Sequence, residues 1–144
     1  MIFLLSIHPV GQFAAILVGL YAAYYGYQRI RSLHFGMTAG FPRKRHAFAG
    51  TVALIFMLAG SVAGSFMKDR FLQNTDLGIH GAVAMLIIVL GLFGIISGYF
   101  LYTTPRKRKI LPVVHGVNNF AILLLALVQI LSGTAAYLRY VLRW

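Results

Sequence analysis

Four histidines are the residues of this 144-residue chain whose type and spacing could support chemistry. Each lies near the start of a different long apolar segment: His8, His46, His80 and His115. Imidazole is the commonest metal ligand among side chains, and an ionisable group inside an apolar membrane segment marks a functional site by default. A lone histidine could simply bond a neighbouring carbonyl, but one in every segment predicts a shared role in binding metal.

The number of histidines on each side of the bundle indicates which metal group they bind. Antiparallel segments would bring His8 and His80 to one side and His46 and His115 to the other. Zinc needs four protein ligands, or three and a water, and neither side offers a cysteine, a glutamate or a nearby aspartate to complete the set. Haem leaves two axial positions for the protein. The sequence therefore predicts two bis-histidine haem b groups, one near each membrane face.

A glycine follows each of these histidines after eighteen residues, at Gly26, Gly64, Gly98 and Gly133. Eighteen residues are five helical turns, so each glycine shares the face of its histidine about 27 Å further along the helix. We expect the missing side chain to leave room for the porphyrin of the opposite site. Small residues also serve helix packing in membranes, and this alternative stays open.

The composition is that of an integral membrane protein. Apolar residues make up 60% of the chain, the mean hydropathy is +0.81, and formally charged side chains number 13 basic and 2 acidic. Four segments reach the roughly 20 residues needed to cross a bilayer, and short loops between them require antiparallel neighbours. We predict an all-α, antiparallel up-down-up-down four-helix bundle, a single transmembrane domain over 1–144. The segments are about 5–30, 43–67, 76–103 and 111–141.

Local signals place the helix starts. Pro9, Pro42 and Pro112 are expected in opening turns, where a helix tolerates proline. The run of Asn74, Thr75 and Asp76 is expected to supply the N-cap of the third helix.

The basic residues predict the orientation in the membrane. Nine flank the first and third loops, whereas four lie on the other side together with both acids, Asp69 and Asp76. By the positive-inside rule the first and third loops face the cytoplasm or stroma, and both termini face the periplasm or lumen. The nine are Arg29, Arg31, Arg43, Lys44, Arg45, Arg106, Lys107, Arg108 and Lys109, and the four are Lys68, Arg70, Arg139 and Arg143.

The same composition excludes several classes of function. The net charge of +11 is confined to the segment ends, so no basic and aromatic surface domain exists to bind nucleic acid. The absence of cysteine excludes disulfides, thiolate ligands, iron–sulfur clusters and c-type haem attachment. No glutamate is present, and both aspartates lie near one loop, which leaves no general acid or base for catalysis.

A few polar residues keep two interpretations each. His34 falls in the first loop, as a solvated side chain or as an aid to an electron donor. Gln12, Asn118 and Asn119 lie one turn beyond a histidine and could orient a haem substituent or a water, or bond a neighbouring helix. The basic loops serve topology and anionic lipid, or steer an anionic donor.

One histidine in each of four helices, paired first with third and second with fourth, resembles the cytochrome b561 superfamily. The similarity is greater to its small four-helix prokaryotic members, found in cyanobacteria, and it covers nearly the whole chain. It implies a multi-pass protein of the bacterial inner or thylakoid membrane. The larger members often carry electrons from ascorbate to monodehydroascorbate or a ferric acceptor. Their two flanking helices have no counterpart here, so their ascorbate sites do not carry over.

We therefore expect transmembrane electron transfer between a small-molecule or protein donor and an acceptor, within the lipid bilayer. Whether the protein is also an oxidoreductase acting at a haem edge stays open, as does membership of a larger complex. One alternative is a pigment-binding or accessory subunit of a photosynthetic or respiratory complex, with each histidine ligating a chlorophyll magnesium. Another is a packing subunit without a cofactor.

Overall fold

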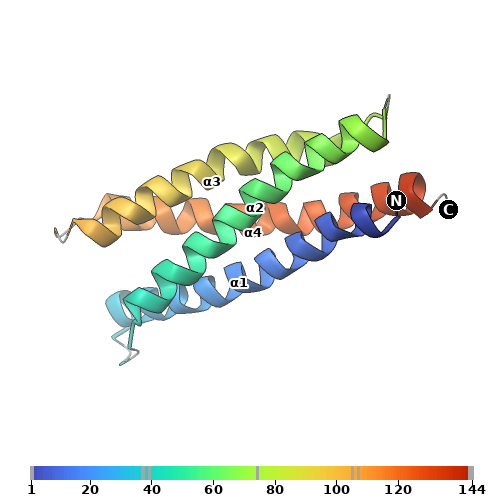
Figure 1. Cartoon of the computed structure of the whole chain (residues 1–144). Coiled ribbons are helices and arrows are strands. Elements are labelled where there is room, and N and C mark those ends of the chain that lie inside the picture. The colour runs from blue at the N-terminus through green and yellow to red at the C-terminus, as the bar shows by residue number, and fades with distance from the viewer. Residues whose placement is uncertain are drawn as a thin grey trace.

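The computed structural model is a bundle of four long α-helices joined by short loops (Figure 1). The structure describes residues 2–36, 38, 40–73, 75–104, 106 and 108–142. Asn74, predicted as part of a helix cap, and the basic residues Lys107 and Arg143 lie outside the described residues. The helices are α1 (Ile2–His34), α2 (Arg43–Phe71), α3 (Ile79–Thr103) and α4 (Ile110–Tyr137), which continues into the π-helical segment η1 (Leu138–Leu142).

All four helices are long and apolar enough to cross a membrane. The shortest, α3, has 25 residues and is therefore about 38 Å long, more than the hydrocarbon thickness of about 30 Å. Large apolar side chains cover the outside of the bundle. Phe3, Phe48 and Leu131 are 79%, 74% and 74% exposed, as expected for side chains that face lipid. The predicted all-α membrane bundle is confirmed.

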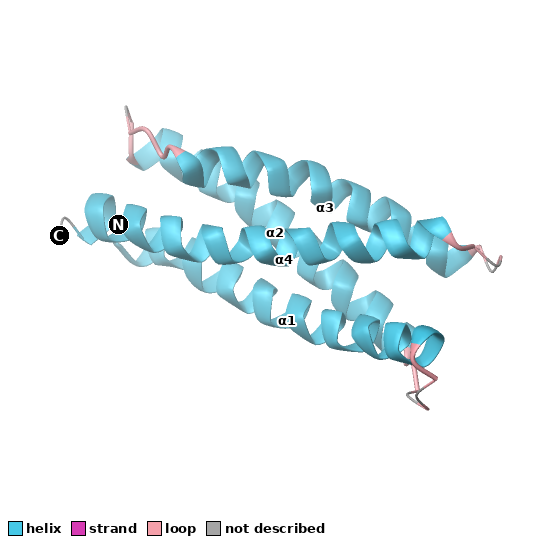
Figure 2. Cartoon of the chain, turned by 180° about the vertical axis from the view of Figure 1, so that it is seen from behind, coloured by secondary structure: helices cyan, strands magenta, loops and turns pink. Residues whose placement is uncertain are grey.

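Successive helices run antiparallel and lie beside one another (Figures 1 and 2). The closest packing joins α1 with α2 and α3 with α4, and looser contacts of α2 with α3 and of α1 with α4 close the ring. Within the described residues α1 faces α3, and α2 faces α4, across the diagonals without backbone contact. The connection between α2 and α3 and both chain ends lie at one end of the bundle, here called the terminal end. The connections from α1 to α2 and from α3 to α4 lie at the other end, here called the basic end.

The middle of the bundle is filled by apolar side chains. Ile122 is 1% exposed and is the largest fully buried side chain of the described residues. It belongs to a buried cluster to which every helix contributes, comprising Ala15, Ile16, Leu54, Met57, Ile87, Ile122 and Ala126. This cluster lies seven to eleven residues beyond the histidine of each helix and so separates the two ends of the bundle.

Two of the predicted helix starts are wrong. Helix α1 begins at Ile2, so Pro9 lies inside it rather than in its opening turn. Because proline has no backbone N–H, Pro9 leaves only the Leu5 carbonyl without its helical hydrogen bond, and α1 continues beyond Pro9. Helix α3 begins at Ile79, after Gly78 with a φ of +49°. Asp76 accepts a hydrogen bond from the Gly78 N–H at 2.8 Å, which forms a tight turn before the helix instead of a cap.

The other helix ends lie within a few residues of their predicted positions. Pro112 is in the first turn of α4, as predicted, and Pro42 immediately precedes α2. The prediction that His34 lies in the first loop is wrong, because it is the last residue of α1. A long apolar helix readily continues into its flanking polar residues, since nothing before Gly36 interrupts it.

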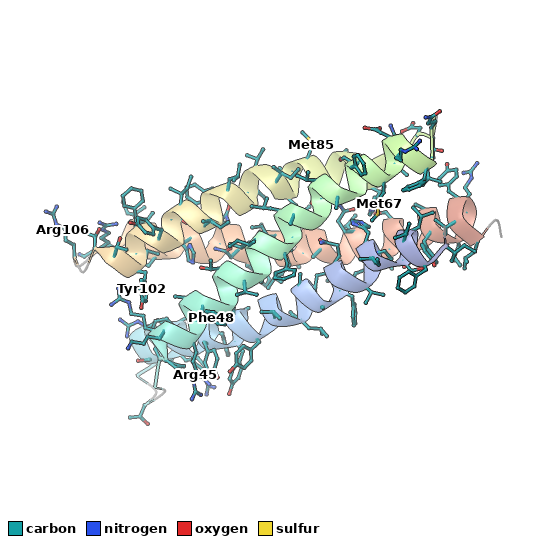
Figure 3. All side chains as sticks on the ribbon, in the orientation of Figure 1. Arg45, Phe48, Met67, Met85, Tyr102 and Arg106 are labelled. Carbon is teal, nitrogen blue, oxygen red and sulfur yellow. The ribbon has the colours of Figure 1, made fainter. Side chains whose placement is uncertain are left out.

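At the basic end one arginine connects two helices. The Arg43 guanidinium, at the start of α2, donates hydrogen bonds to the carbonyls of Leu101 and Tyr102 near the end of α3. It also lies over the Tyr102 ring, 4.9 Å from its centre. Arg45, Tyr102 and Arg106 all lie at this end (Figure 3). The contacts of Arg43 thereby hold the α2 and α3 ends of the two basic loops together.

Candidate functional site

The four histidines meet as two facing pairs, one toward each end of the bundle. The ring centres of His8 on α1 and His80 on α3 are 6.5 Å apart, with the ring planes at 86°. Those of His46 on α2 and His115 on α4 are 6.4 Å apart, at 76°. These are the pairs that the antiparallel order of the segments predicts, and each pair spans one diagonal of the bundle.

The separation within each pair suits two axial ligands of one metal ion. Metal–imidazole bonds of about 2 Å, together with the radius of the ring, place the centres of two opposed imidazoles roughly 6.3 Å apart. The observed 6.5 and 6.4 Å agree with this value. Among the described residues no group of three or more histidine, cysteine or acidic side chains could hold a metal ion. A metal here would therefore need most of its ligands from a non-protein group.

In helices α3 and α4 a serine of the adjacent helix holds each imidazole. Ser97 Oγ lies 2.8 Å from Nδ1 of His115, and Ser132 Oγ lies 3.1 Å from Nδ1 of His80. Each hydroxyl donates its own hydrogen to its helix, to the Phe93 carbonyl in one case and to the Val128 carbonyl in the other. Each serine oxygen is therefore placed to accept a hydrogen bond from an Nδ1–H, in the tautomer that leaves the lone pair on Nε2.

For His46 on α2, a backbone carbonyl of α1 is the hydrogen-bond partner in place of a serine. His46 Nδ1 lies 2.9 Å from the carbonyl oxygen of Ala22, which can only accept, so the proton is again on Nδ1. His8 is different. Its buried Nδ1 has no hydrogen-bond partner in the described part of the chain, although the Gly60 backbone lies beside the ring. In His46 and His80, no hydrogen bond within the described residues uses Nε2, which is left as a coordinating nitrogen, whereas Nε2 of His115 lies 3.4 Å from the amide nitrogen of Asn119.

Each glycine of the eighteen-residue pattern lies against a histidine of the adjacent helix. Gly26 and Gly64 contact His46 and His8 respectively, so the contacts between α1 and α2 are reciprocal. A Cβ atom would come within 3.4 Å of His46 Cε1 at Gly26 and within 2.8 Å of His8 Cε1 at Gly64. The sequence pattern suggested room for a porphyrin, and the immediate neighbour of each glycine is an imidazole.

Helices α3 and α4 repeat this reciprocal arrangement. A Cβ atom at Gly98 would lie 3.2 Å from His115 Cε1, and one at Gly133 would lie 2.9 Å from His80 Cε1. The bundle is thus built from two similar antiparallel helix pairs. At Gly64, Gly98 and Gly133 the missing side chain lets an imidazole lie against the backbone, whereas Gly26 leaves room for a methyl group.

The amide side chains near the histidines bond protein groups. Gln12 donates to the Phe56 carbonyl at 3.0 Å, and Asn118 donates to the Leu90 carbonyl at 3.0 Å, so both connect adjacent helices. Asn119 donates to the carbonyl of His115 at 2.7 Å, and its nitrogen also lies 3.3 Å from Nδ1 of that ring. Of the two interpretations, interhelical bonding describes Gln12 and Asn118, whereas Asn119 lies beside the imidazole.

Ser97 and Ser132 are the site residues that the sequence reasoning did not assign. Each immediately precedes a glycine of the pattern, in the similar runs Ile96-Ser97-Gly98 and Leu131-Ser132-Gly133. The sequence did contain a signal for these serines: in both helices a serine and a glycine follow the histidine after seventeen and eighteen residues. The spacing along one helix does not show the partner of the serine, because each serine bonds the histidine of the adjacent helix.

Comparisons of the chain with protein-family models, with curated proteins and with solved structures find no match. The resemblance of the sequence to the cytochrome b561 superfamily therefore stays a prediction that depends on the histidine pattern.

Proposed function

We propose that this protein carries electrons across a membrane through two haem b groups. His8 and His80 would be the axial ligands of one, and His46 and His115 those of the other. The observation that carries the proposal is the pair of facing imidazoles at 6.5 and 6.4 Å, with no further protein ligand among the described residues. A haem supplies four equatorial nitrogens and reversible one-electron chemistry, and it requires only two axial ligands.

Bis-histidine ligation limits what such a site can do. With the two histidines of a pair bound to the metal, small molecules such as oxygen would have no coordination site on it. The Nδ1 bonds of His46, His80 and His115 hold these rings in place and direct Nε2 toward coordination. These features favour outer-sphere electron transfer over catalysis at the metal. Any substrate reduction would take place at an exposed haem edge.

The spacing of the two pairs supports a path across the bilayer. Gly26 contacts His46 and lies eighteen residues after His8, so the pairs are about 27 Å apart along α1. That separation places one pair toward each face of a hydrocarbon core about 30 Å thick. The apolar cluster around Ile122 lies between them and fills the centre of the bundle. Electrons would cross while the bundle stays closed.

The charge distribution gives the proposed orientation. Basic side chains gather at the basic end, and both acids lie at the terminal end, where Lys68 and Asp69 form an ion pair of 3.4 Å. The positive-inside rule places the basic end in the cytoplasm or stroma and the termini in the periplasm or lumen. The membrane would be a bacterial inner or thylakoid membrane.

The optical spectrum of the purified protein tests the cofactor. We expect sharp, reversible haem b bands in the reduced-minus-oxidised difference spectrum. A chlorophyll-binding subunit, with single magnesium ligands, would show pigment bands without such redox bands. A folded protein without pigment would favour a packing subunit. Either of these two results would contradict the proposal.

Vesicles test the electron transfer itself. Ferricyanide trapped inside vesicles that contain the protein should be reduced by a membrane-impermeant reductant added outside. Vesicles without protein give the background rate. Vesicles with the His80→Ala variant should fall to that background, because one of the two sites would be missing. Equal rates with and without the protein would contradict transmembrane transfer.

A further inference from the structure

We infer that Ser97 and Ser132 set the reduction potentials of the two sites, and that the His46/His115 site has the lower potential. The inference depends on the proposed haem function. It names two positioning residues and a direction of electron flow, neither of which follows from the histidine pairs alone. One electron would leave the His46/His115 site, whose iron is oxidised, and reach the His8/His80 site, whose iron is reduced.

The physical link is the hydrogen bond at Nδ1. A ligating imidazole that donates a strong Nδ1–H bond gains electron density at Nε2 and stabilises the ferric state of its metal. Hydrogen bonding around the ligands is therefore one of the levers that a protein has on a haem potential. In a histidine bound to metal through Nε2 the proton is on Nδ1, so the oxygens of Ser97 and Ser132, whose hydroxyl hydrogens can be donated to helix carbonyls, would accept from it.

The two sites differ in how well this bond is made. At the basic end both rings are bonded, His46 at 2.9 Å to the Ala22 carbonyl and His115 at 2.8 Å to Ser97. At the terminal end His80 is bonded to Ser132 at 3.1 Å, and His8 Nδ1 has no hydrogen-bond partner within the described residues, although the Gly60 backbone lies beside the ring. Ser97 is also 2% exposed, so water does not compete for its bond. The ferric state is consequently better stabilised at the basic end.

The surface cations at the basic end have the opposite effect on the reduction potential of the His46/His115 site. Positive charge raises a reduction potential, and the basic end carries most of it. Arg43, Lys44 and Arg45 are exposed, however, so water and salt screen their field over about 10 Å at 0.1 M and about 3 Å at 1 M. The Nδ1 bonds are inside the bundle and are not screened. The inferred order of the potentials should therefore persist, and the gap should widen, as salt is raised.

Optical redox titration of the full-length protein in detergent, with its native haem content, tests the inference. Variants lacking one pair first assign the two transitions: His80→Ala leaves the His46/His115 transition, and His115→Ala leaves the other. Ser97→Ala should then raise only the lower midpoint, increasing the reduced-to-oxidised ratio of that site about 2- to 10-fold at a fixed potential, as loss of one hydrogen bond implies. Ser132→Ala should raise only the upper midpoint.

Two controls separate this effect from general disturbance of a helix. Ser61 makes the same bond to its own helix, donating to the Met57 carbonyl at 2.9 Å, but within the described part of the chain it forms no hydrogen bond with a histidine. Ser61→Ala should leave both midpoints unchanged. Ser132→Thr keeps the hydroxyl, so the upper midpoint potential should stay at its wild-type value.

The outcomes also distinguish this inference from the proposed function. A protein that binds no haem would overturn the proposed function itself. If the protein binds two haems and neither midpoint potential changes in Ser97→Ala or Ser132→Ala, only the role of the serines would be overturned. A lower midpoint assigned to the His8/His80 site would overturn the direction of flow.

Discussion

Gly64 on α2 leaves the space that the imidazole of His8 on α1 fills. A methyl group at Gly64 would come within 2.8 Å of His8 Cε1, a distance that real Cβ atoms essentially never show. The neighbour is a ring held within a helix interface, so the contact could be relieved only by moving the imidazole. The position of His8 therefore depends on a residue 56 positions later in the chain.

Gly64→Ala should therefore displace His8 and weaken the His8/His80 site. We expect loss of haem from that site alone, measured as haem per protein. The matched control is Gly26→Ala, where the added methyl would lie 3.4 Å from His46, an ordinary contact that should be tolerated. Gly11→Ala, which meets nothing within 4 Å, controls for substitution of a helix glycine. Equal haem retention in the Gly64 and Gly26 variants would refute this reading of the glycine pattern.

The nearly perpendicular imidazole planes predict a spectroscopic signature. The rings of His8 and His80 are at 86°, and those of His46 and His115 are at 76°. Low-spin ferric haem with perpendicular axial imidazoles gives a strongly anisotropic electron paramagnetic resonance signal with a large principal g value, whereas parallel rings give a rhombic signal. We expect the first kind from both sites. Two rhombic signals would show that the rings rotate when haem binds.

The central cluster should stabilise the bundle independently of the cofactor sites. Ile122 is 1% exposed and is surrounded by buried apolar side chains. Ile122→Ala should lower the free energy of unfolding in detergent by about 2–5 kcal/mol, because it leaves a cavity. Ile55→Ala removes the same atoms from a side chain that is 51% exposed and should have a much smaller effect. Similar losses in the two variants would argue that the cluster is not the stabilising core.

The architecture could be predicted from the sequence because each segment is too apolar to remain outside a membrane and each loop is too short to reach a distant helix. Those two constraints alone place the first helix opposite the third and the second opposite the fourth. The pairing of His8 with His80 follows from that order. The positions of Pro9 and Gly78 show where local signals were insufficient, since a proline was accommodated inside α1 and a turn delayed the start of α3.

The details of the site depend on the register between neighbouring helices, which no single segment encodes. The spacing of His80 and Gly98 is visible along α3, but the contact of Gly98 with His115 of α4 requires both helices. The same is true of Ser97, whose hydroxyl bonds His115 and not His80. Helix packing determines such interhelical contacts, so the sequence showed the spacing of these residues but not the histidine that each of them contacts.

The most direct test of the central claim is the haem content of single-histidine variants. His80→Ala and His115→Ala should each bind one haem per protein where the unaltered chain binds two, with helical content unchanged by circular dichroism. His34→Ala changes a histidine outside both pairs and should still bind two. A His80 or His115 variant that keeps both haems would contradict the ligation proposed for the facing imidazoles.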